Sequence, residues 1–228
     1  MSLAANPDQI ILIDKPAGIS SFGVVAVVRR YLTRLLGRRI KVGHCGTLDP
    51  FATGLLILVS GRNTRRAGEF SGLDKVYQAT IRLGARSTTG DPEGEITESH
   101  SRPPSLEHIR EVLSQFTGQI QQVPPSYSAI KVNGRRAYQL ARAGKPVALS
   151  PRTVQVDSIE LVSYSYPELT IKTKVSSGTY IRSLASDMGE RLGTGAYTVA
   201  LRRLSIGSYD VAQAHQLRTE AESGKLTL

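Results

Sequence analysis

The sequence predicts an α+β sheet domain. Segments with the alternating pattern of strands and segments with the three-to-four-residue spacing of helices follow one another in mixed order, which favours α+β over a doubly wound parallel sheet. A length of 228 residues, 40% of them hydrophobic, is ample for one core. No internal repeat, low-complexity linker or second domain is visible, so we expect one domain over residues 1–228.

The N-terminal part of the chain is expected to form a strand followed by a helix. The apolar run 9–14 predicts a buried strand, after which the segment 15–18 (KPAG) turns the chain. Ser20 or Ser21 can cap the helix, and Gly37 ends it. Apolar residues expected on the inward face of this helix are Val24, Val28, Leu32, Leu35 and Leu36.

The middle of the chain combines strands with a long polar segment. The apolar segment 55–59 predicts a strand, and a short helix is expected after Asn63. Residues 75–83 (KVYQATIRL) predict a half-buried strand. The candidates for its inner face are Val76, Ala79, Ile81 and Leu83, which do not all fit one two-residue period. The segment 84–104 is polar and turn-rich, and we expect a mobile surface loop there. Its acids would repel nucleic acid and are expected to be bystanders: Asp91, Glu93, Glu95 and Glu98.

The rest of the chain is expected to continue this mixed order. The expected elements are a helix capped by Ser105 that runs to about Phe116, with Leu106, Ile109, Val112 and Leu113 inward; a strand at 126–132; a helix at 137–143; an antiparallel pair at 153–164 and 168–176; a helix at 180–192 ended by Gly193; and a strand at 197–205.

The charge balance points to a polyanionic partner. Twenty-nine Lys and Arg residues against nineteen Asp and Glu residues give a net charge of +10 and a pI near 9.9. Such an excess concentrates polyanions near the protein, so nucleic acid is the leading partner. An anionic membrane surface is the rival, but it usually requires a basic amphipathic helix or a lipidation signal. No secretory or membrane-spanning segment is visible, and we expect a cytoplasmic location without membrane association.

Several kinds of active site lack their motifs. The sequence has no GxGxxG, GxxxxGK[ST], HExxH or GxSxG pattern, and its four histidines are scattered. A single cysteine, Cys45, excludes an internal disulfide and a cysteine-based zinc site. Its neighbour His44 could suggest a nucleophilic pair, but side chains adjacent in sequence rarely face each other. We therefore expect neither a metal nor an organic cofactor.

Asp49 is the most informative single residue. It lies in the segment 43–54 (GHCGTLDPFATG) and is the first acid after Asp14, with seven Lys or Arg residues between the two. A lone carboxylate beside a basic surface weakens the attraction of that surface for phosphates, so a function is one explanation for it. An Asp before Pro in a glycine-rich loop also often caps a turn. The residues alone leave both interpretations open.

Two further segments carry candidate residues. Tyr77, on the strand 75–83, is either an ordinary strand tyrosine or an aromatic face for a ligand. Arg182 falls in the first turn of the helix expected at 180–192, where it opposes the helix dipole by a few tenths to about 1 kcal/mol. A compensating anion is therefore expected, which could be only a surface glutamate. Basic residues that together favour a phosphate-binding surface gather in three clusters: Arg62, Arg65 and Arg66; Lys131, Arg135, Arg136, Arg142 and Lys145; and Arg202 and Arg203.

Five segments together resemble the TruB family of pseudouridine synthases. They are DKPAGISS (14–21), GHCGTLDPFATGLL (43–56), KVYQATIRLG (75–84), SSGTYIRSLASDMG (176–189) and VALRRLSIG (199–207). The GHxGTLDPxATG block is highly specific. Enzymes of this family convert uridine 55 in the T arm of tRNA to pseudouridine. The resemblance implies the pseudouridine synthase fold, a mixed, mostly antiparallel sheet with flanking helices and a central cleft.

The resemblance also implies a role for each matching residue. Asp49 corresponds to the essential aspartate, and Arg182 of the YIR segment to its partner. Tyr77 corresponds to the tyrosine that stacks on the target base. The other matching positions are Tyr180 of the YIR segment, His44 among the displaced T-loop bases, Leu201 in the uracil pocket, and Lys15 and Pro16 in a motif that supports the active-site loop. Contacts with the RNA backbone are expected from Lys15, Arg62, Lys131 and Arg202.

The chemistry of the family accounts for this set of residues. The reaction breaks the bond from C1′ to N1, turns the uracil and joins C1′ to C5, which is an isomerisation that requires no cofactor. A stacked nucleotide cannot be reached, so it must be flipped out and held on an aromatic face. Asp49 would then act at C6, at C1′ or on the C2′ proton, and the sequence leaves these routes open.

The resemblance further implies a stand-alone enzyme that acts on the T arm of tRNA without a guide RNA or an obligate protein partner. No unused apolar helix face is visible in the sequence, so we expect a monomer. A non-catalytic tRNA-folding chaperone and a guide-dependent enzyme like the dyskerin branch are the alternatives. The chain departs from the family pattern in two ways. The C-terminal PUA-like domain usual in bacterial members is expected to be absent, and Cys45 replaces a common Thr or Ser, as a small packing change or an oxidisable thiol.

Overall fold

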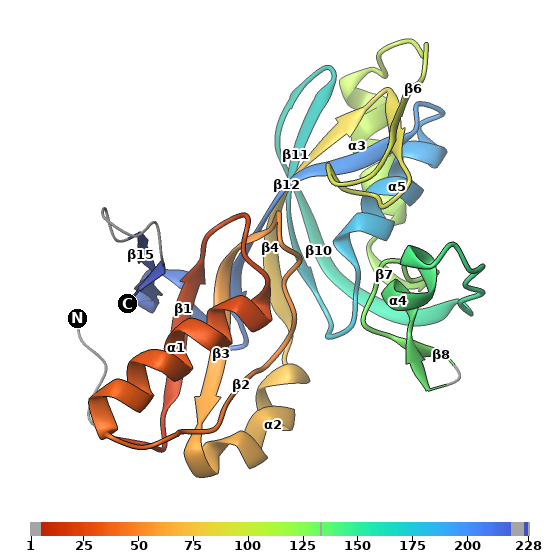
Figure 1. Cartoon of the computed structure of the whole chain (residues 1–228). Coiled ribbons are helices and arrows are strands. Elements are labelled where there is room, and N and C mark those ends of the chain that lie inside the picture. The colour runs from red at the N-terminus through yellow and green to blue at the C-terminus, as the bar shows by residue number, and fades with distance from the viewer. Residues whose placement is uncertain (1–5, 133, 220–225, 228) are drawn as a thin grey trace. The chain divides into compact units, whose positions relative to one another are not determined.

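The computed structural model describes residues 6–132, 134–219 and 226–227, and these residues form two compact units (Figure 1). Unit 1 comprises Met1–Tyr77 and Leu201–Leu228, and unit 2 comprises Gln78–Ala200. The expected α+β class with a mixed, mostly antiparallel sheet is confirmed. Both unit boundaries fall inside strands, so the chain passes from one unit to the other along β4 (Lys75–Leu83) and β12 (Ala196–Ile206).

Strand β3 is the centre of unit 1. It covers Thr53–Ser60 and pairs antiparallel with β1 (Ile10–Lys15) and with β2 (Val42–His44). It pairs parallel with the C-terminal part of β12, where Arg203 is the register partner of Gly54. The shorter elements of the unit are η1 (Gly61–Arg66), α2 (Ala67–Ser71), β13 (Tyr209–Asp210), η2 (Val211–Gln213), β14 (His215–Gln216), β15 (Arg218–Thr219) and β16 (Leu226–Thr227).

Helix α1 covers the apolar face of β1 and β3. It runs over Ser21–Leu36, and the hydroxyl of Ser20 caps it by accepting a hydrogen bond from the backbone N–H of Gly23 at 3.0 Å. Gly37 ends it in the left-handed conformation, with φ at 66°. The predicted inward face is confirmed except for Leu35, which is 43% exposed in the last turn. Periodicity sets the direction of a side chain but not whether a neighbour covers it.

Unit 2 contains an antiparallel sheet in the order β4-β11-β10-β7. The predicted pair is confirmed as β10 (Arg152–Ser165) and β11 (Glu168–Val175). Helices α3 (Leu106–Gln115), α4 (Ala137–Arg142) and α5 (Ile181–Arg191) lie where they were predicted, and α5 buries Ile181, Leu184, Ala185 and Met188. Leu106, predicted to point inward, is 42% exposed because it is the first residue of α3.

The strand predictions were wrong between residues 118 and 132, where a strand with mostly polar side chains was missed. The strand expected at 126–132 is limited to β8 (Lys131–Val132), which pairs with β9 (Arg135–Arg136). The neighbouring strand is instead β7 (Gly118–Gln122), which the sequence analysis missed. Its sequence GQIQQ has one apolar side chain, so the backbone pairing with β10 and not an apolar pattern makes it a strand.

The inner face of β4 was assigned partly wrongly. Burial alternates strictly along the strand, as the two-residue period of a strand requires. The buried side chains are therefore Lys75, Tyr77, Ala79, Ile81 and Leu83, and Val76 lies on the opposite face.

The polar segment 84–104 is more ordered than expected. It forms a small antiparallel hairpin of β5 (Ala85–Ser87) and β6 (Ile96–Glu98). Asp91, in the turn between these strands, is only 4% exposed. The prediction of a surface loop with bystander acids is therefore wrong for Asp91, whose partner is described below.

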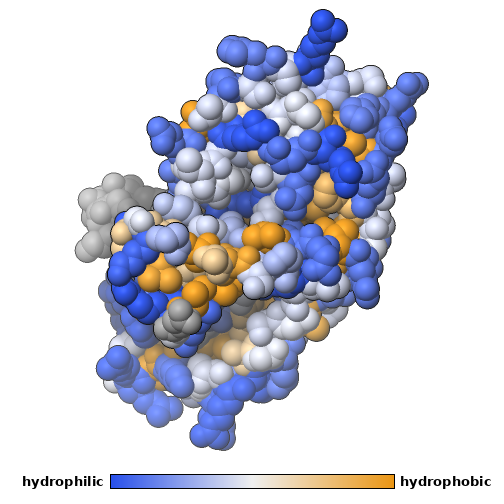
Figure 2. Space-filling model, turned by 90° about the vertical axis from the view of Figure 1, so that its right-hand side faces the viewer, coloured by the Kyte–Doolittle hydropathy of each residue, from blue (hydrophilic) through white to orange (hydrophobic). Residues whose placement is uncertain are grey.

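The surface is mostly hydrophilic on the face shown in Figure 2, with hydrophobic residues in smaller areas between the polar ones. The most exposed large hydrophobic side chain in the described part of the chain is Phe22, at 65%. None of the described helices has the length and apolar character needed to cross a membrane.

We predict that Gly54 tolerates no side chain. Its φ is 101°, and a Cβ atom there would collide with the backbone N and O of Arg203 in the parallel pairing of β3 with β12. Gly54→Ala should lower the free energy of unfolding by about 3 kcal/mol or more. Gly37→Ala is the matched control, because Gly37 also has a positive φ but no atom within 4 Å of the added Cβ, so only ~1–2 kcal/mol should be lost. Urea denaturation followed by circular dichroism measures both values, and equal losses would contradict the collision.

Candidate active site

Asp49 lies in the loop that joins β2 to β3. The backbone N–H of Cys45 donates to the carbonyl of Ile57 at 2.8 Å, so the loop leaves the sheet after residue 45. The N–H of Ala52 donates to the carbonyl of Asp49 at 3.2 Å, which closes a tight turn around Pro50. Asp49 is half-buried. The turn-capping and functional interpretations of this residue are therefore compatible, because the turn sets the direction of its side chain.

The turn before α1 and Ser21, the first residue of that helix, hold one side of this loop. The hydroxyl of Ser21 donates to the carbonyl of Leu48 at 2.9 Å and accepts from the N–H of the same residue at 2.8 Å. The N–H of Gly18 donates to the carbonyl of Pro50 at 2.8 Å, and the ammonium of Lys15 donates to the same carbonyl at 3.1 Å. The expected support of the loop by the 15–16 segment agrees with these contacts.

The expectation that Lys15 contacts the RNA backbone is wrong. Lys15 is fully buried, and its ammonium also donates to the carbonyls of Pro16 and Ile19, each at 2.8 Å. Residues alternate along β1, and the sequence does not reveal that position 15 faces inward. The ammonium binds backbone carbonyls, so it is not available to a phosphate.

Arg203 holds the other side of the loop. Its guanidinium donates to the carbonyl of Leu55 at 2.7 Å through Nε, to that of Gly46 at 3.1 Å through Nη2, and to that of Thr47 at 3.5 Å through Nη1. The side chain is 1% exposed, so its assignment to a phosphate-binding surface cluster is wrong. The strand period of β12 explains this, since residues 201 and 203 face inward while 202 does not.

Tyr77 is connected to the same guanidinium. Nη1 of Arg203 lies 3.4 Å from the hydroxyl of Tyr77, and the guanidinium carbon lies 6.0 Å from the centre of its ring. Both distances are at the outer limit for a hydrogen bond and a cation–π contact, so each interaction is weak. Together they place the ring of Tyr77 beside Arg203. Leu201 is 8% exposed, and its carbonyl is 3.4 Å from the hydroxyl of Thr53. His44 is half-buried at the end of β2, where it pairs with Leu58.

Tyr180 and Arg182 lie in unit 2, at the start of α5. The ring of Tyr180 packs against the guanidinium of Arg152, whose carbon is 4.9 Å from the ring centre. Its backbone N–H donates to the side-chain oxygen of Gln122 at 2.8 Å. Structure and sequence thus place four candidate residues in unit 1 (His44, Asp49, Tyr77 and Leu201) and two in unit 2 (Tyr180 and Arg182).

Arg182 has a buried carboxylate partner that the sequence analysis missed. Its Nη1 donates to Oδ2 of Asp91 at 2.9 Å and to the carbonyl of Thr89 at 2.7 Å, and its Nη2 donates to the carbonyl of Tyr127 at 2.8 Å. Both side chains of the ion pair are about 5% exposed or less. The expectation of a compensating anion was right, but the suggested surface glutamate is not the partner.

Asp91 is itself held in place. Its Oδ1 accepts from the hydroxyl of Thr89 at 2.6 Å and from the N–H of Glu93 at 3.0 Å. A Cβ at Gly90, whose φ is 72°, would lie 3.3 Å from Cβ of Arg182, so glycine permits this close approach. Asp91 precedes a proline and follows a glycine, as an Asp in a tight turn often does. That pattern is the signal from which a fixed carboxylate could have been predicted.

A pocket of about 260 Å³ in unit 2 adjoins Arg182. It is rich in hydroxyl groups, including those of Thr89 and Ser186, and contains the carboxyl of Asp187. Burial, followed by the nearby charge of Glu190, raises the pKa of Asp187 to about 6. A shifted carboxyl in a polar pocket is a frequent feature of functional sites.

The remaining predicted residues differ in exposure. Lys131 is exposed, and Arg62 is largely exposed and forms an ion pair with Asp8 at 2.7 Å. Arg202 is partly exposed and donates to both carboxylate oxygens of Asp14, at 3.0 and 2.7 Å. Within the described residues, no group of three His, Cys, Asp or Glu residues could hold a metal ion.

Cys45 is not a reactive thiol. It is 1% exposed, and burial raises the pKa of its thiol to about 11. The thiolate required of a nucleophile or of an easily oxidised residue is therefore scarce at neutral pH. Of the two interpretations of this substitution, the small packing change is the one that the structure supports.

The chain matches two family models. Residues 33–181 match the N-terminal domain of the TruB family of pseudouridylate synthases, and residues 182–223 match the tRNA pseudouridylate synthase B C-terminal domain. The chain belongs to the TruB family. The matched range of the first model contains Asp49, Tyr77 and Tyr180, and the second begins at Arg182.

Curated relatives of the TruB family cover most of the chain. A tRNA pseudouridine synthase B from Leifsonia xyli subsp. xyli is 49% identical over 219 residues, which are 92% of this chain and 70% of the relative. The enzyme of the same name from Aquifex aeolicus is 44% identical and covers 92% of this chain and 72% of its own. That from Chlamydia muridarum is 43% identical and covers 93% and 87%.

Two solved structures have a similar fold over most of this chain. A chain from a Cbf5-Nop10-Gar1 complex is 29% identical, with a TM-score of 0.69, over 93% of this chain and 53% of that one. A chain from the archaeal box H/ACA sRNP Nop10-Cbf5 complex is 28% identical, with a TM-score of 0.65, over 92% and 51%. The present chain spans about half the length of these two chains.

We predict that Arg203 positions the Asp49 loop. Arg203→Lys keeps the charge but replaces three separately placed nitrogens with a single ammonium, which cannot meet the carbonyls of Leu55, Gly46 and Thr47 in their present positions. The loop should therefore move slightly. Displacing a catalytic group by about 1 Å can lower the rate ~100-fold. We therefore expect kcat for pseudouridine formation to fall ~10–100-fold, and KM to change less than about threefold. Arg30→Lys is the matched control, because Arg30 is exposed on α1 and contacts no part of the loop, and it should stay within about twofold of wild type. A change in KM alone, or equal effects of the two substitutions, would contradict the positioning role.

We predict that Asp187 makes the stability of the protein depend on pH. Its pKa of about 6 in the folded state lies above the ordinary value of 3.8, so the folded state binds more protons than the unfolded state between these pH values. The contribution of the protonated Asp187 to the free energy of unfolding is fully present below pH 3.8 and is lost as the pH rises through about 6. Asp187→Asn should therefore raise the melting temperature relative to wild type at pH 7.5, and the difference should vanish near pH 4. A difference that is the same at both pH values would argue against the shift.

Proposed function

We propose that the protein isomerises uridine 55 in the T arm of tRNA to pseudouridine, with Asp49 as the essential carboxylate. Membership of the TruB family and the curated tRNA pseudouridine synthase B relatives support pseudouridine formation in tRNA as the reaction. The position of the modified uridine and the role of each residue rest on the motifs and on the construction of the Asp49 loop.

The observation that carries the proposal is the way the Asp49 loop is held. Ser21 binds the loop at Leu48, Gly18 and Lys15 bind it at Pro50, and Arg203 binds it at Gly46 and Thr47. The loop backbone on both sides of Asp49 is thus fixed by groups from three elements. Fixing a carboxylate in advance removes the entropic cost of placing it when the substrate binds, which is a large part of catalysis by positioning.

The other residues complete a site for a flipped nucleotide. Tyr77 supplies an aromatic face for the uracil, and Leu201 an apolar wall. His44 packs among the bases displaced from the T loop. Tyr180, the N-cap residue of α5, and Arg182, in its first turn, correspond by resemblance to substrate-binding residues of the family. Asp91 holds the guanidinium of Arg182 in place through the 2.9 Å ion pair.

The reaction needs one carboxylate and no redox step. Breaking the bond from C1′ to N1 and joining C1′ to C5 conserves all atoms of the uridine except for the exchange of the C5 proton with solvent. Asp49 starts the sequence as a base or nucleophile at C6, at C1′ or on the C2′ proton, and the three routes share its ionised form. Departure of the C5 proton completes the isomerisation.

The substrate is the T arm stem-loop, bound without a guide RNA and by a monomer. Exposed cations such as Arg62, Lys131 and Arg202 contact the RNA backbone. A non-catalytic tRNA-folding chaperone needs no carboxylate on a loop whose backbone is held by three elements, so the Asp49 loop favours the enzyme. A cytoplasmic location and the monomeric state stay predictions.

We predict that Asp49→Asn abolishes pseudouridine formation while tRNA binding stays within a few fold of wild type. The substitution keeps the shape of the side chain and removes its charge, so the loop contacts made by its neighbours remain. Tritium release from 5-³H-uridine in a 17-nucleotide T-arm hairpin measures the reaction, and filter binding measures affinity.

The same hairpin tests the alternatives. Release by wild type from the bare hairpin excludes both a guide requirement and a purely non-catalytic chaperone. Full activity of Asp49→Asn would overturn the assignment of the carboxylate. No release by wild type from either the hairpin or full-length tRNA would overturn the proposed reaction.

A further inference from the structure

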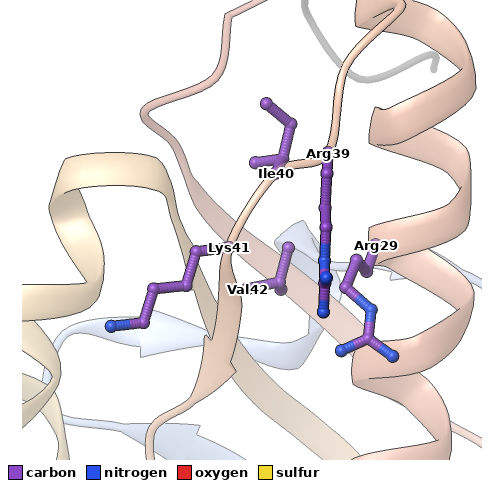
Figure 3. Close-up of a pocket in the computed structure, with 5 residues that line it drawn as sticks. All are labelled: Arg29, Arg39, Ile40, Lys41 and Val42. Carbon is purple, nitrogen blue, oxygen red and sulfur yellow. The ribbon is translucent and has the colours of Figure 1, made fainter.

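Unit 1 contains a pocket lined by three cations and no acid. Its volume is about 360 Å³, and its lining consists of Arg29 from α1 and of residues 39–42, which lead into β2 (Figure 3). Arg39 and Lys41 are exposed, and Arg29 is half-buried. In Figure 3 the side chains of Arg29 and Arg39 lie side by side with their guanidinium groups pointing the same way, and Lys41 extends to the other side of the strand, away from both. None of these residues belongs to the candidate active site.

The three cations lack a compensating charge. Among the described residues, neither Arg29, Arg39 nor Lys41 forms an ion pair, whereas Arg62 and Arg202 elsewhere on the surface are each paired with an aspartate. The side chain of Arg29 lies over the exposed ring of Phe22, whose centre is 6.0 Å from the guanidinium carbon. Like charges that share a concavity repel each other, and a bound anion would relieve that repulsion.

The lining selects for phosphate over a nucleobase. Two guanidinium groups and an ammonium are the donors that bind phosphate oxygens best. The other lining residues, Ile40 and Val42, are aliphatic. The pocket therefore offers no aromatic face for a base to stack on and no side-chain acceptor to read a base edge. A site with cationic donors and aliphatic side chains fits the phosphates that every nucleotide carries, so we expect its affinity to depend little on sequence.

The pocket lies within reach of a polynucleotide that occupies the Asp49 loop. Lys41 precedes Asp49 by eight residues in the same unit, and eight residues span at most about 29 Å. Strand β2 runs between the two positions and is fixed by its pairing with β3, and the carbonyl of Lys41 accepts from the N–H of Gly61 at 2.9 Å. The pocket thus has a fixed place relative to the loop.

We propose that the pocket of Arg29, Arg39 and Lys41 is a binding site for backbone phosphates of the RNA substrate, away from the nucleotide that reacts. The proposal rests on the proposed function for the identity of the RNA. The pocket adds affinity without base specificity and takes no part in the chemical step.

The test compares two double variants that remove the same charge. Arg39→Gln with Lys41→Gln removes two exposed cations from the pocket. Arg30→Gln with Arg34→Gln removes two exposed cations of α1 that do not line it. Each variant lowers the formal net charge from +10 by two. Filter binding over a series of salt concentrations with two tRNAs of different T-stem sequence measures affinity, and tritium release at saturating tRNA measures kcat.

The pocket variant should lower the affinity for both tRNAs about tenfold at 0.1 M salt. It should also reduce the slope of log Kd against log salt concentration by about one to two. Its kcat should stay within about twofold of wild type, and the α1 variant should change affinity less than about threefold. An equal loss of affinity in the two variants, or a loss of affinity for only one of the tRNAs, would overturn the proposed phosphate site. If wild type converts neither tRNA but the pocket variant alone loses affinity, the phosphate site stands and the proposed reaction fails.

Discussion

The geometry around Asp49 depends on the buried guanidinium of Arg203. A charge removed from water is costly unless its donors are paired, and here the carbonyls of Leu55, Gly46 and Thr47 accept from it. Those carbonyls belong to β3 and to the loop before it, so a single side chain of β12 ties the loop to the sheet. The same group lies next to Tyr77. Two candidate functional residues therefore share one support.

Other buried cations work in the same way. Lys15 donates to three carbonyls around the KPAG turn, and Lys75 donates to the carbonyls of Ser71 and Leu73. Burial, together with the charge of Arg203, lowers the pKa of Lys75 to about 8. Part of the net charge of +10 is thus structural, and only the exposed part can attract a polyanion. Cation counts from sequence overstate a binding surface for this reason.

The two units fix their functional groups by different chemistry. In unit 1, backbone carbonyls accept hydrogen bonds from the buried cations Lys15 and Arg203. In unit 2, Arg182 is neutralised by Asp91 inside a hairpin turn. An ion pair that is about 5% exposed is costly to break by removing one partner, because the other charge stays buried. Arg182 is therefore held rigidly before any RNA binds.

Local patterns determined much of this protein. The caps and period of α1, the alternation of β4 and the pair β10–β11 are short-range features, and so is the GHCGTLDPFATG block, which by resemblance singled out Asp49. Predictions that failed concern which neighbour covers a side chain: Leu35 is exposed, and Lys15, Arg203 and Asp91 are buried. Only the tertiary structure decided these, because burial and pairing join residues such as 91 and 182 that no local period connects. The sequence thus identified the carboxylate, and the fold determined what holds it.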